Sequence, residues 1–352
     1  MDILVKEGYL KKAKEMHRKY PVADAHLDLA GEILIRRKLG EENVIKKHYA
    51  ESWKKAGLNV VISSVYVPTR ILEEGGVQGA WEDTLAQIKA LKEDLEPLAD
   101  FFLITDKEGL NEAVRGEKAG VLLYMEGLDC IGEDISLIEE LYYMGVRGAS
   151  LTWSRKNALA TGCCKAGEYR QISGRLSKYG KKAVEELERL SMFLDISHLN
   201  DEGFEEVFQM ANRPFAATHS CARAVYDNYR NLTEKQMEQL AEKGGFMGLN
   251  GCKLIAGSKA GNHLEMLCRH AEYEVKKIGA AHVGFGFDLC DSYDRADAQL
   301  RGGKRPEEMD CFCDHSQIPL LTAALLQRGM KEQDVKMLIG GSVARYLEKV
   351  LP

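Results

Sequence analysis

A closed (β/α)8 barrel, the TIM-barrel fold, is the architecture that this sequence of 352 residues predicts. Eight short apolar runs rich in β-branched residues recur along the chain, and segments with helical periodicity lie between them. Strands that alternate with helices imply a parallel sheet, and eight such units are enough to close it. An open, doubly wound sheet is the competing architecture, but no G-x-G-x-x-G motif follows the first expected strand.

The expected elements follow one another in regular order. The eight strands cover residues 22–28, 59–67, 119–126, 145–152, 192–198, 214–220, 244–250 and 282–288. The run FFLIT at 101–105 is expected to be an extra strand outside the barrel. Helices are expected within 81–100, 177–190, 205–211, 233–243 and 262–279. Because no low-complexity linker or short repeat interrupts the pattern, we expect one domain over residues 1–352, with helical segments at both ends packed onto the barrel.

Composition and charge exclude several classes of partner. Hydrophobic content of 45% and charged content of 29% fit a soluble globular protein, and a net charge of −6 argues against nucleic acid as a partner. The N-terminus lacks a signal-peptide h-region and no window approaches a membrane span, so we expect a cytoplasmic protein without a membrane partner. Nine cysteines fit reduced thiols in that compartment. The alternative is metal binding by the Cys163–Cys164 pair or by Cys311 and Cys313, although paired C-x2-C spacing is missing.

The first expected strand carries an unusual polar pattern. In PVADAHLDLA, residues 21–30, Asp24, His26 and Asp28 occupy alternate positions and therefore share one face of the strand. Burying a charge without a partner costs several kcal/mol. Something of opposite charge is therefore expected on that face. Asp24 lies one pleat deeper than the other two, and is either an orienting group behind a ligand or a satisfied buried carboxylate.

Further polar residues fall at the carboxyl ends of other expected strands, where the active sites of such barrels lie. If the barrel closes, these side chains converge on one small volume, and three imidazoles with two carboxylates suit zinc or a similar divalent ion. Two ions then share the site: the first strand holds one, two histidines hold the other, and a glutamate bridges them. The candidate ligands are His26, Asp28, Glu126, His198 and His219, and Asp288 ends the eighth strand beside them.

The motifs DAHLD, MEG, LTW, DISH, THS and HVGFGFD occur together, with an arginine eleven residues after the histidine of THS. In this combination the chain resembles the membrane dipeptidase (renal dipeptidase) family, peptidase family M19, whose fold is an amidohydrolase-like barrel. The likeness extends from residue 24 to LIGGSVARYLEKVL at the end of the chain. It implies a homodimeric hydrolase with two Zn²⁺ that cleaves small dipeptides, including some with a C-terminal D-residue, by a metal-bridged hydroxide.

The resemblance also implies a role for individual residues. It assigns the five candidate ligands to a binuclear zinc centre, with Glu126 as the bridge and, together with Asp288, as a catalytic group. Asp288 matches the aspartate that handles protons, and Arg230 matches the arginine that holds the substrate carboxylate, although an isolated arginine is more commonly a solvated loop charge. Trp153 and Asn250 are expected to line the substrate pocket, with a structural rim position as the alternative for Trp153.

The chain departs from the family pattern at Ser342, where GGS replaces the usual C-terminal GGN, and at two positions near the expected site. Mammalian members carry a histidine that contacts substrate where this chain has Trp153, and a second aspartate where it has Cys290. These departures leave two alternatives open beside the dipeptidase. One is an amidohydrolase that acts on another small amide or lactone, and the other is a non-catalytic barrel with a decayed site.

Overall fold

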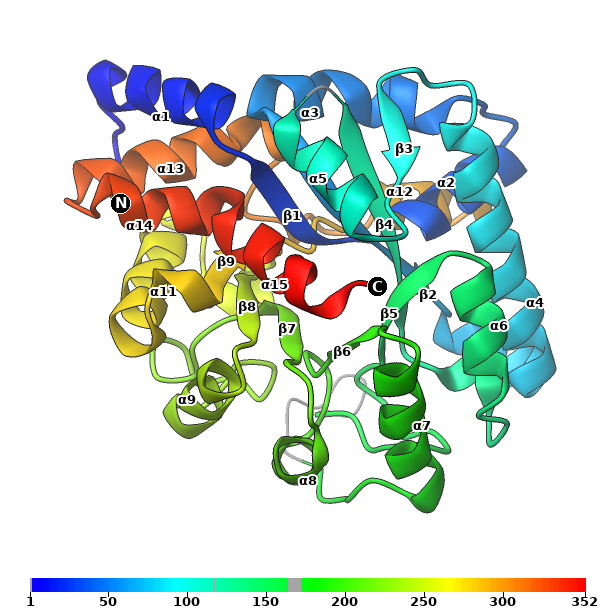
Figure 1. Ribbon diagram of the computed structural model, residues 1–352. Helices are drawn as coiled ribbons and strands as arrows, with labels where there is room; N and C mark the ends of the chain where they lie inside the picture. Colours follow the sequence, from blue (N-terminus) through cyan, green and yellow to red (C-terminus); the bar gives the residue numbers. More distant parts are fainter. Residues whose placement is uncertain (1, 117, 164–171) are drawn as a thin grey trace.

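Eight parallel strands form a nearly closed barrel surrounded by helices in the computed structural model, which describes residues 2–116, 118–163 and 172–352 (Figure 1). Within these residues the strand order around the barrel follows the chain, and every neighbouring pair is parallel. The barrel strands are β1 (Val22–Leu27), β2 (Leu58–Tyr66), β4 (Ala119–Glu126), β5 (Val146–Ser150), β6 (Phe193–Asp195), β7 (Ala216–Ser220), β8 (Phe246–Leu249) and β9 (Val283–Phe285). The predicted TIM barrel is confirmed, and the extra strand forms as β3 (Phe101–Leu103), which pairs with β4 outside the ring.

Helices cover the outside of the barrel, and the first and last elements of the described chain are also helices (Figure 1). None of the helices in the described ranges is long and apolar enough to cross a lipid bilayer. The helix bounds are α1 (Glu7–Lys19), α2 (Leu29–Lys38), α3 (Ala50–Ala56), α4 (Thr69–Leu95), α5 (Lys107–Arg115), α6 (Leu137–Tyr143), α7 (Lys178–Arg189), α8 (Asp201–Met210), α9 (Glu234–Glu242), α10 (Lys253–Ala256), α11 (His263–Ile278), α12 (Asp291–Leu300), α13 (Ile318–Gln327), α14 (Glu332–Lys336) and α15 (Ser342–Val350), with a short 3-10 turn, η4, at His315–Gln317.

Local sequence signals begin several of these helices. The Ser177 hydroxyl accepts hydrogen bonds from two backbone N–H groups at the start of α7, and Thr233 and Gln236 form a reciprocal capping box at the start of α9. The predicted helix within 81–100 is the second part of α4, which begins earlier and bends at Gly76, where φ is 58°. Glycine tolerates this left-handed conformation, so the bend costs little there.

The last strands of the barrel are shorter than predicted. β6 ends at Asp195 rather than at residue 198, because the Asp195 carboxylate accepts the Ser197 N–H at 3.0 Å and draws the chain into a turn. β9 ends at Phe285, and Asp288 adopts φ 56°, which no strand residue has. His198 and Asp288 therefore lie on loops just beyond the strands, at the same end of the barrel as the other polar residues.

Helix α15 closes the opposite end of the barrel. Its side chains Val343, Tyr346 and Leu347 belong to one buried apolar cluster with residues of the strand interiors, among them Val60 and Phe246. In Figure 1 this helix and the C-terminus lie at the centre of the ring of strands. The amino ends of the strands are thus filled by apolar packing, which leaves the carboxyl ends for chemistry.

A buried histidine joins the N-terminal helix to the rest of the fold. The His17 ring donates from Nδ1 to Ala56 O at 2.7 Å and meets the Thr322 hydroxyl with Nε2 at 2.8 Å, which links α1 to α3 and α13. Burial lowers the pKa of His17 from 6.5 to about 4, so the ring is neutral in the folded protein at neutral pH.

This histidine is expected to make the fold sensitive to mild acid. Between pH 6.5 and 4 the unfolded chain binds a proton at His17 that the folded chain does not. The contribution of His17 to the free energy of unfolding therefore falls as the pH falls. The lowered pKa of His17 corresponds to a free energy of unfolding that is about 2 kcal/mol smaller at pH 5 than at pH 7. Urea unfolding at pH 7 and pH 5 is expected to show that the free energy of unfolding falls less for His17→Gln than for the wild type. Equal losses would contradict this role, since His270, with a pKa also lowered by burial to about 4, is present in both proteins.

Candidate metal centre

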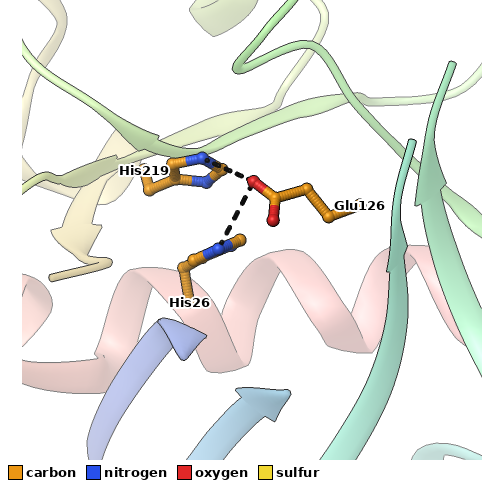
Figure 2. A group of neighbouring side chains, drawn as sticks. All are labelled: His26, Glu126 and His219. Atoms are coloured by element: carbon orange, nitrogen blue, oxygen red, sulfur yellow. Dashed lines mark ion pairs between the residues drawn. The ribbon is translucent and has the colours of Figure 1, made fainter. Parts of the chain in front are cut away.

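One carboxylate oxygen lies at the centre of the polar cluster. Glu126 is the last residue of β4, and its Oε1 lies 2.9 Å from His198 Nε2, 3.3 Å from His219 Nε2 and 3.6 Å from His26 Nε2. Figure 2 shows His26 and His219 one above the other, each joined to this oxygen by a dashed line. The three imidazoles come from β1, from the turn after β6 and from β7, so closure of the barrel brings together side chains that are remote in the sequence.

Two aspartates complete the cluster on the other side of His26. His26 Nε2 lies 3.9 Å from Asp28 Oδ1 and 3.8 Å from Asp288 Oδ1. Among the described residues, the ligand atoms of His26, Glu126 and His219 lie within 4.8 Å of one another, and so do those of His26, Asp28 and Asp288. The structure therefore gathers all five predicted ligands and the predicted proton-handling aspartate in one place.

The imidazoles are in the state that binds a metal. His26 is fully buried, and neither of its ring nitrogens has a hydrogen-bond partner within the described residues. Leaving such a group unsatisfied costs free energy, and a cation that takes the nitrogen lone pair removes that cost. Burial lowers the pKa of His26 to about 3 and lowers the pKa values of His198 and His219 well below 6.5, so all three rings are neutral.

The carboxyl groups of the cluster are held in an environment that disfavours their ionised form. Burial, followed by the neighbouring Asp28 and Asp288, raises the pKa of Glu126 well above 4.5. Burial also raises the pKa of Asp28 to about 6 and that of Asp288 to about 8. Three carboxylates this close ionise together only if cations lie between them. Neutral imidazoles and carboxylates are a donor set that zinc accepts, so the residues fit divalent metal ions.

Hydrogen bonds behind the imidazoles fix their orientation. Ser154 Oγ lies 2.7 Å from His198 Nδ1, and Thr218 Oγ1 lies 2.8 Å from His219 Nδ1. Because Thr218 donates its own proton to Asp195 Oδ2 at 2.7 Å, it accepts the Nδ1–H of His219 and leaves the Nε2 lone pair facing the cluster. The sequence analysis did not single out these supporting groups, although a polar Asp195 inside an apolar strand was a visible signal.

Asp24 is a satisfied buried carboxylate. It accepts the Phe287 N–H at 2.9 Å and the His26 N–H at 3.3 Å, and its second oxygen lies 2.9 Å from His315 Nε2 on η4. These bonds hold the backbone of β1 against the segment after β9. Asp24 thus supports the position of His26 only through the backbone. This favours the interpretation of Asp24 as a satisfied buried carboxylate over that of an orienting group behind a ligand.

Arg230 lies inside the cluster rather than in solvent. Its side chain is buried, with Nη1 donating to Ser197 O and Nη2 donating to His219 O at 3.1 Å. Nη2 also lies 3.3 Å from His198 Nε2. A guanidinium held beside the imidazoles presents a fixed positive charge where a substrate would approach them.

Asn250 contacts Asp288 directly. Its amide donates to Asp288 Oδ2 at 3.0 Å and to His219 O at 3.2 Å, while its carbonyl accepts the Cys252 N–H at 2.7 Å. The Asp288 N–H donates to His26 O at 3.2 Å, across the seam between β9 and β1. The left-handed backbone of Asp288 is therefore held from both sides, and strain of this kind clusters at functional sites.

The family of this chain is given by comparison with known proteins. The sequence profile of the membrane dipeptidase family (peptidase family M19) matches residues 10–351. The chain belongs to this family. It is accordingly a hydrolase of the metallo-dipeptidase type, as the motifs predicted.

Individual relatives agree with this assignment. Dipeptidase 3 of Rattus norvegicus is 26% identical over 97% of this chain, which spans 67% of that protein's length. The solved structure of dipeptidase AC, a metallo peptidase of family M19, superposes with a TM-score of 0.79 at 24% identity, covering 94% of this chain and 99% of the other. A metallo peptidase from Rhodobacter sphaeroides, liganded with a phosphinate mimic of the dipeptide L-Ala-D-Ala, gives a TM-score of 0.78 at 23% identity with the same coverage. These structural likenesses support the fold.

The two departures near the expected site occupy different places in this M19 protein. Trp153 lies beside the cluster, with its ring 5.5 Å from that of His198 and 5.3 Å from that of Tyr66. The Arg155 guanidinium lies over both Trp153 and Tyr66 and is held by Asp129. The side chains thus form an aromatic wall next to one imidazole.

Cys290 lies in the loop after Asp288. Its backbone N–H and its thiol both donate to Asp310 Oδ1, at 3.1 and 3.6 Å. Of the other cysteines considered as metal ligands, Cys311 and Cys313 are free thiols and belong to no metal-binding group among the described residues, whereas Cys164 lies outside those residues.

Proposed function

We propose that this chain is a metal-dependent dipeptidase that hydrolyses the peptide bond of small dipeptides. The observation that carries the proposal is the position of Glu126 Oε1 among three neutral imidazoles, one of which, His26, has no hydrogen-bond partner for either ring nitrogen in the described part of the chain. A buried cluster of this composition has no evident use other than to hold cations.

Two Zn²⁺ ions fit the proposal best. His26 and Asp28 would hold one and His198 and His219 the other, with Glu126 as a ligand common to both. When bound, zinc lowers the pKa of water to roughly 7 and polarises a carbonyl oxygen. The protein supplies neutral imidazoles that are oriented before substrate arrives, because Ser154 contacts the His198 ring and Thr218 holds His219 in one tautomer.

Asp288 is proposed to move the proton. Its Oδ1 lies 3.8 Å from His26 Nε2, and its Oδ2 is held by Asn250. A carboxylate whose pKa is raised by burial both accepts a proton from the attacking water and gives it up to the leaving amine near neutral pH. The peptide nitrogen thus leaves as a neutral amine.

Arg230 is proposed to bind the free carboxylate of the substrate. A guanidinium matches a carboxylate with two parallel hydrogen bonds. Because Arg230 is buried and fixed close to His198, only a carboxylate one residue away from the scissile bond reaches it. This restricts the substrate to dipeptides, and the dipeptide mimic bound by the Rhodobacter sphaeroides peptidase supports the inclusion of D-residues in the test.

A panel of L-L and L-D dipeptides, with and without a chelator, tests the proposal. We expect hydrolysis of dipeptides, loss of activity on chelation and recovery on addition of zinc, with metal content measured in parallel. Turnover of an N-acyl amino acid or a lactone with no dipeptide hydrolysed would instead support the other amidohydrolase. A protein that binds no zinc would support a decayed site.

Asn250→Ala is expected to lower kcat/KM about ten- to a hundred-fold, the range typical of residues that orient a catalytic group. The Asn250 amide lowers the pKa of Asp288, so its removal raises that pKa and moves the acid limb of the kcat/KM profile to higher pH. Asn59→Ala, which removes a hydrogen bond to Val22 N at the far end of the barrel, is the control. An unchanged pH profile in Asn250→Ala, with zinc content also unchanged, would contradict the positioning role.

A further inference from the structure

A second group of metal-binding side chains lies outside the cluster around Glu126. It consists of Cys221, in the segment after β7, and of His270 and Glu274, one turn apart on α11. The ligand atoms of these three residues lie within 4.8 Å of one another, and all three side chains are fully buried. None of them belongs to the proposed catalytic machinery.

Glu274 is the residue that most needs an explanation. Neither of its carboxyl oxygens makes a hydrogen bond of normal geometry within the described residues. The Ala222 N–H interacts with the Glu274 carboxyl group, but its hydrogen bond at 3.2 Å goes to His270 Nδ1. An ionised carboxylate buried in this way costs several kcal/mol, so Glu274 is either protonated or paired with a cation.

His270 is oriented as metal-binding histidines are. Its Nε2–H donates to Ala256 O at 3.1 Å, which places the lone pair on Nδ1. Nδ1 accepts the Ala222 N–H at 3.2 Å, and a zinc ion bound there would replace that hydrogen bond. A backbone carbonyl on the far ring nitrogen is the usual support for a histidine that ligates through the other one.

We propose that Cys221, His270 and Glu274 form a buried zinc site with three protein ligands. A thiolate, a carboxylate and a neutral imidazole around Zn²⁺ give a complex with no net charge, which a fully buried position tolerates. Thiolate and imidazole favour zinc over calcium or magnesium. Because no side chain of the group reaches solvent, the ion enters while the chain folds.

The site would steady the segment that carries Arg230. The Cys221 N–H donates to Asn231 Oδ1 at 3.1 Å, and the Asn231 amide donates to Ile255 O at 2.9 Å. Zinc bound to Cys221 and to two residues of α11 ties this network to the outer helix layer. The loop between β7 and α9 is then anchored both by the hydrogen bonds of Asn231 and by the zinc ion bound to α11.

Cobalt substitution tests the site separately from the catalytic centre. Cys221 is the only cysteine among the proposed ligands of either site, so a thiolate-to-cobalt charge-transfer band reports on this site alone. We expect the band in the wild type and in Cys268→Ser, which alters another buried cysteine of α11, and its absence in Cys221→Ser. Glu126→Gln, which disrupts the catalytic cluster, is expected to retain the band.

Glu274→Gln provides a second, nearly isosteric test. If Glu274 binds zinc, the variant holds about one equivalent less zinc than the wild type and unfolds at a lower temperature in excess zinc. If Glu274 is only a protonated buried acid, the variant keeps its zinc content and its Tm. That result, or the absence of the charge-transfer band from the wild type, would overturn the proposal, and the zinc content of Glu274→Gln decides it if Cys221→Ser does not fold.

Discussion

Glu126→Gln is expected to abolish dipeptide hydrolysis, with kcat/KM falling by at least about a thousand-fold, because the loss of metal-derived charge stabilisation removes several kcal/mol from the transition state. Glutamine keeps the size of the side chain but removes the charge that faces His26, His198 and His219. The amide also replaces one acceptor oxygen by a donor that points at neutral nitrogens. Both the affinity for zinc and the shape of the cluster are therefore expected to change.

The measurement pairs bound zinc with kcat/KM at saturating zinc. Asp94→Asn is the matched control, because Asp94 is a buried carboxylate remote from the cluster that accepts the backbone N–H groups of Val44 and Ile45. We expect the control to lose stability but to keep its zinc and its turnover. Full zinc content together with wild-type turnover in Glu126→Gln would show that the carboxylate is not needed at the site.

The order of strands was predictable because each is a short apolar run between amphipathic helices. The first four strands are long, and their predicted and observed bounds differ by at most two residues. Of the later strands, β6 and β9 each end three residues before the predicted end, since the apolar pattern continues through Ile196 and Phe287 after the ladder has ended. Side-chain hydrogen bonds from Asp195 and the left-handed backbone of Asp288 end those strands, and neither has a signature in hydrophobic periodicity.

The members of the cluster were predictable for a different reason. Parallel strands of a barrel end at one rim, so polar residues at strand ends converge whatever their separation in sequence. The direction of a long side chain is not fixed in this way, and the burial of Arg230 follows only from the carbonyls of Ser197 and His219 that it meets in the folded chain. His270 and Glu274 were read as part of an ordinary helix, because their partner Cys221 comes from a distant loop.

Arg230→Lys is expected to raise KM for dipeptides about a hundred-fold with a smaller change in kcat, since truncating one partner of a buried charge pair costs about 2–5 kcal/mol. Lysine keeps the charge but not the planar fork that grips a carboxylate with two hydrogen bonds. Arg223→Lys is the matched control, because Arg223 lies on the same loop but forms a bidentate pair with Asp201 instead of facing His198. Its KM is expected to stay near the wild-type value.

A dipeptide amide separates recognition of the carboxylate from a structural effect of the substitution. The wild type is expected to bind the amide poorly, because the Arg230 guanidinium then faces no negative charge. Arg230→Lys should lose little further affinity for it, so the effects of the two changes are not additive. If the substitution instead weakens hydrolysis of the acid and of the amide by the same factor, the bonds from Arg230 to Ser197 O and His219 O explain the loss, and the carboxylate is held by another group. Because these bonds engage both terminal nitrogens of the guanidinium, a substrate carboxylate would share Nη2, beside His198, with the carbonyl of His219.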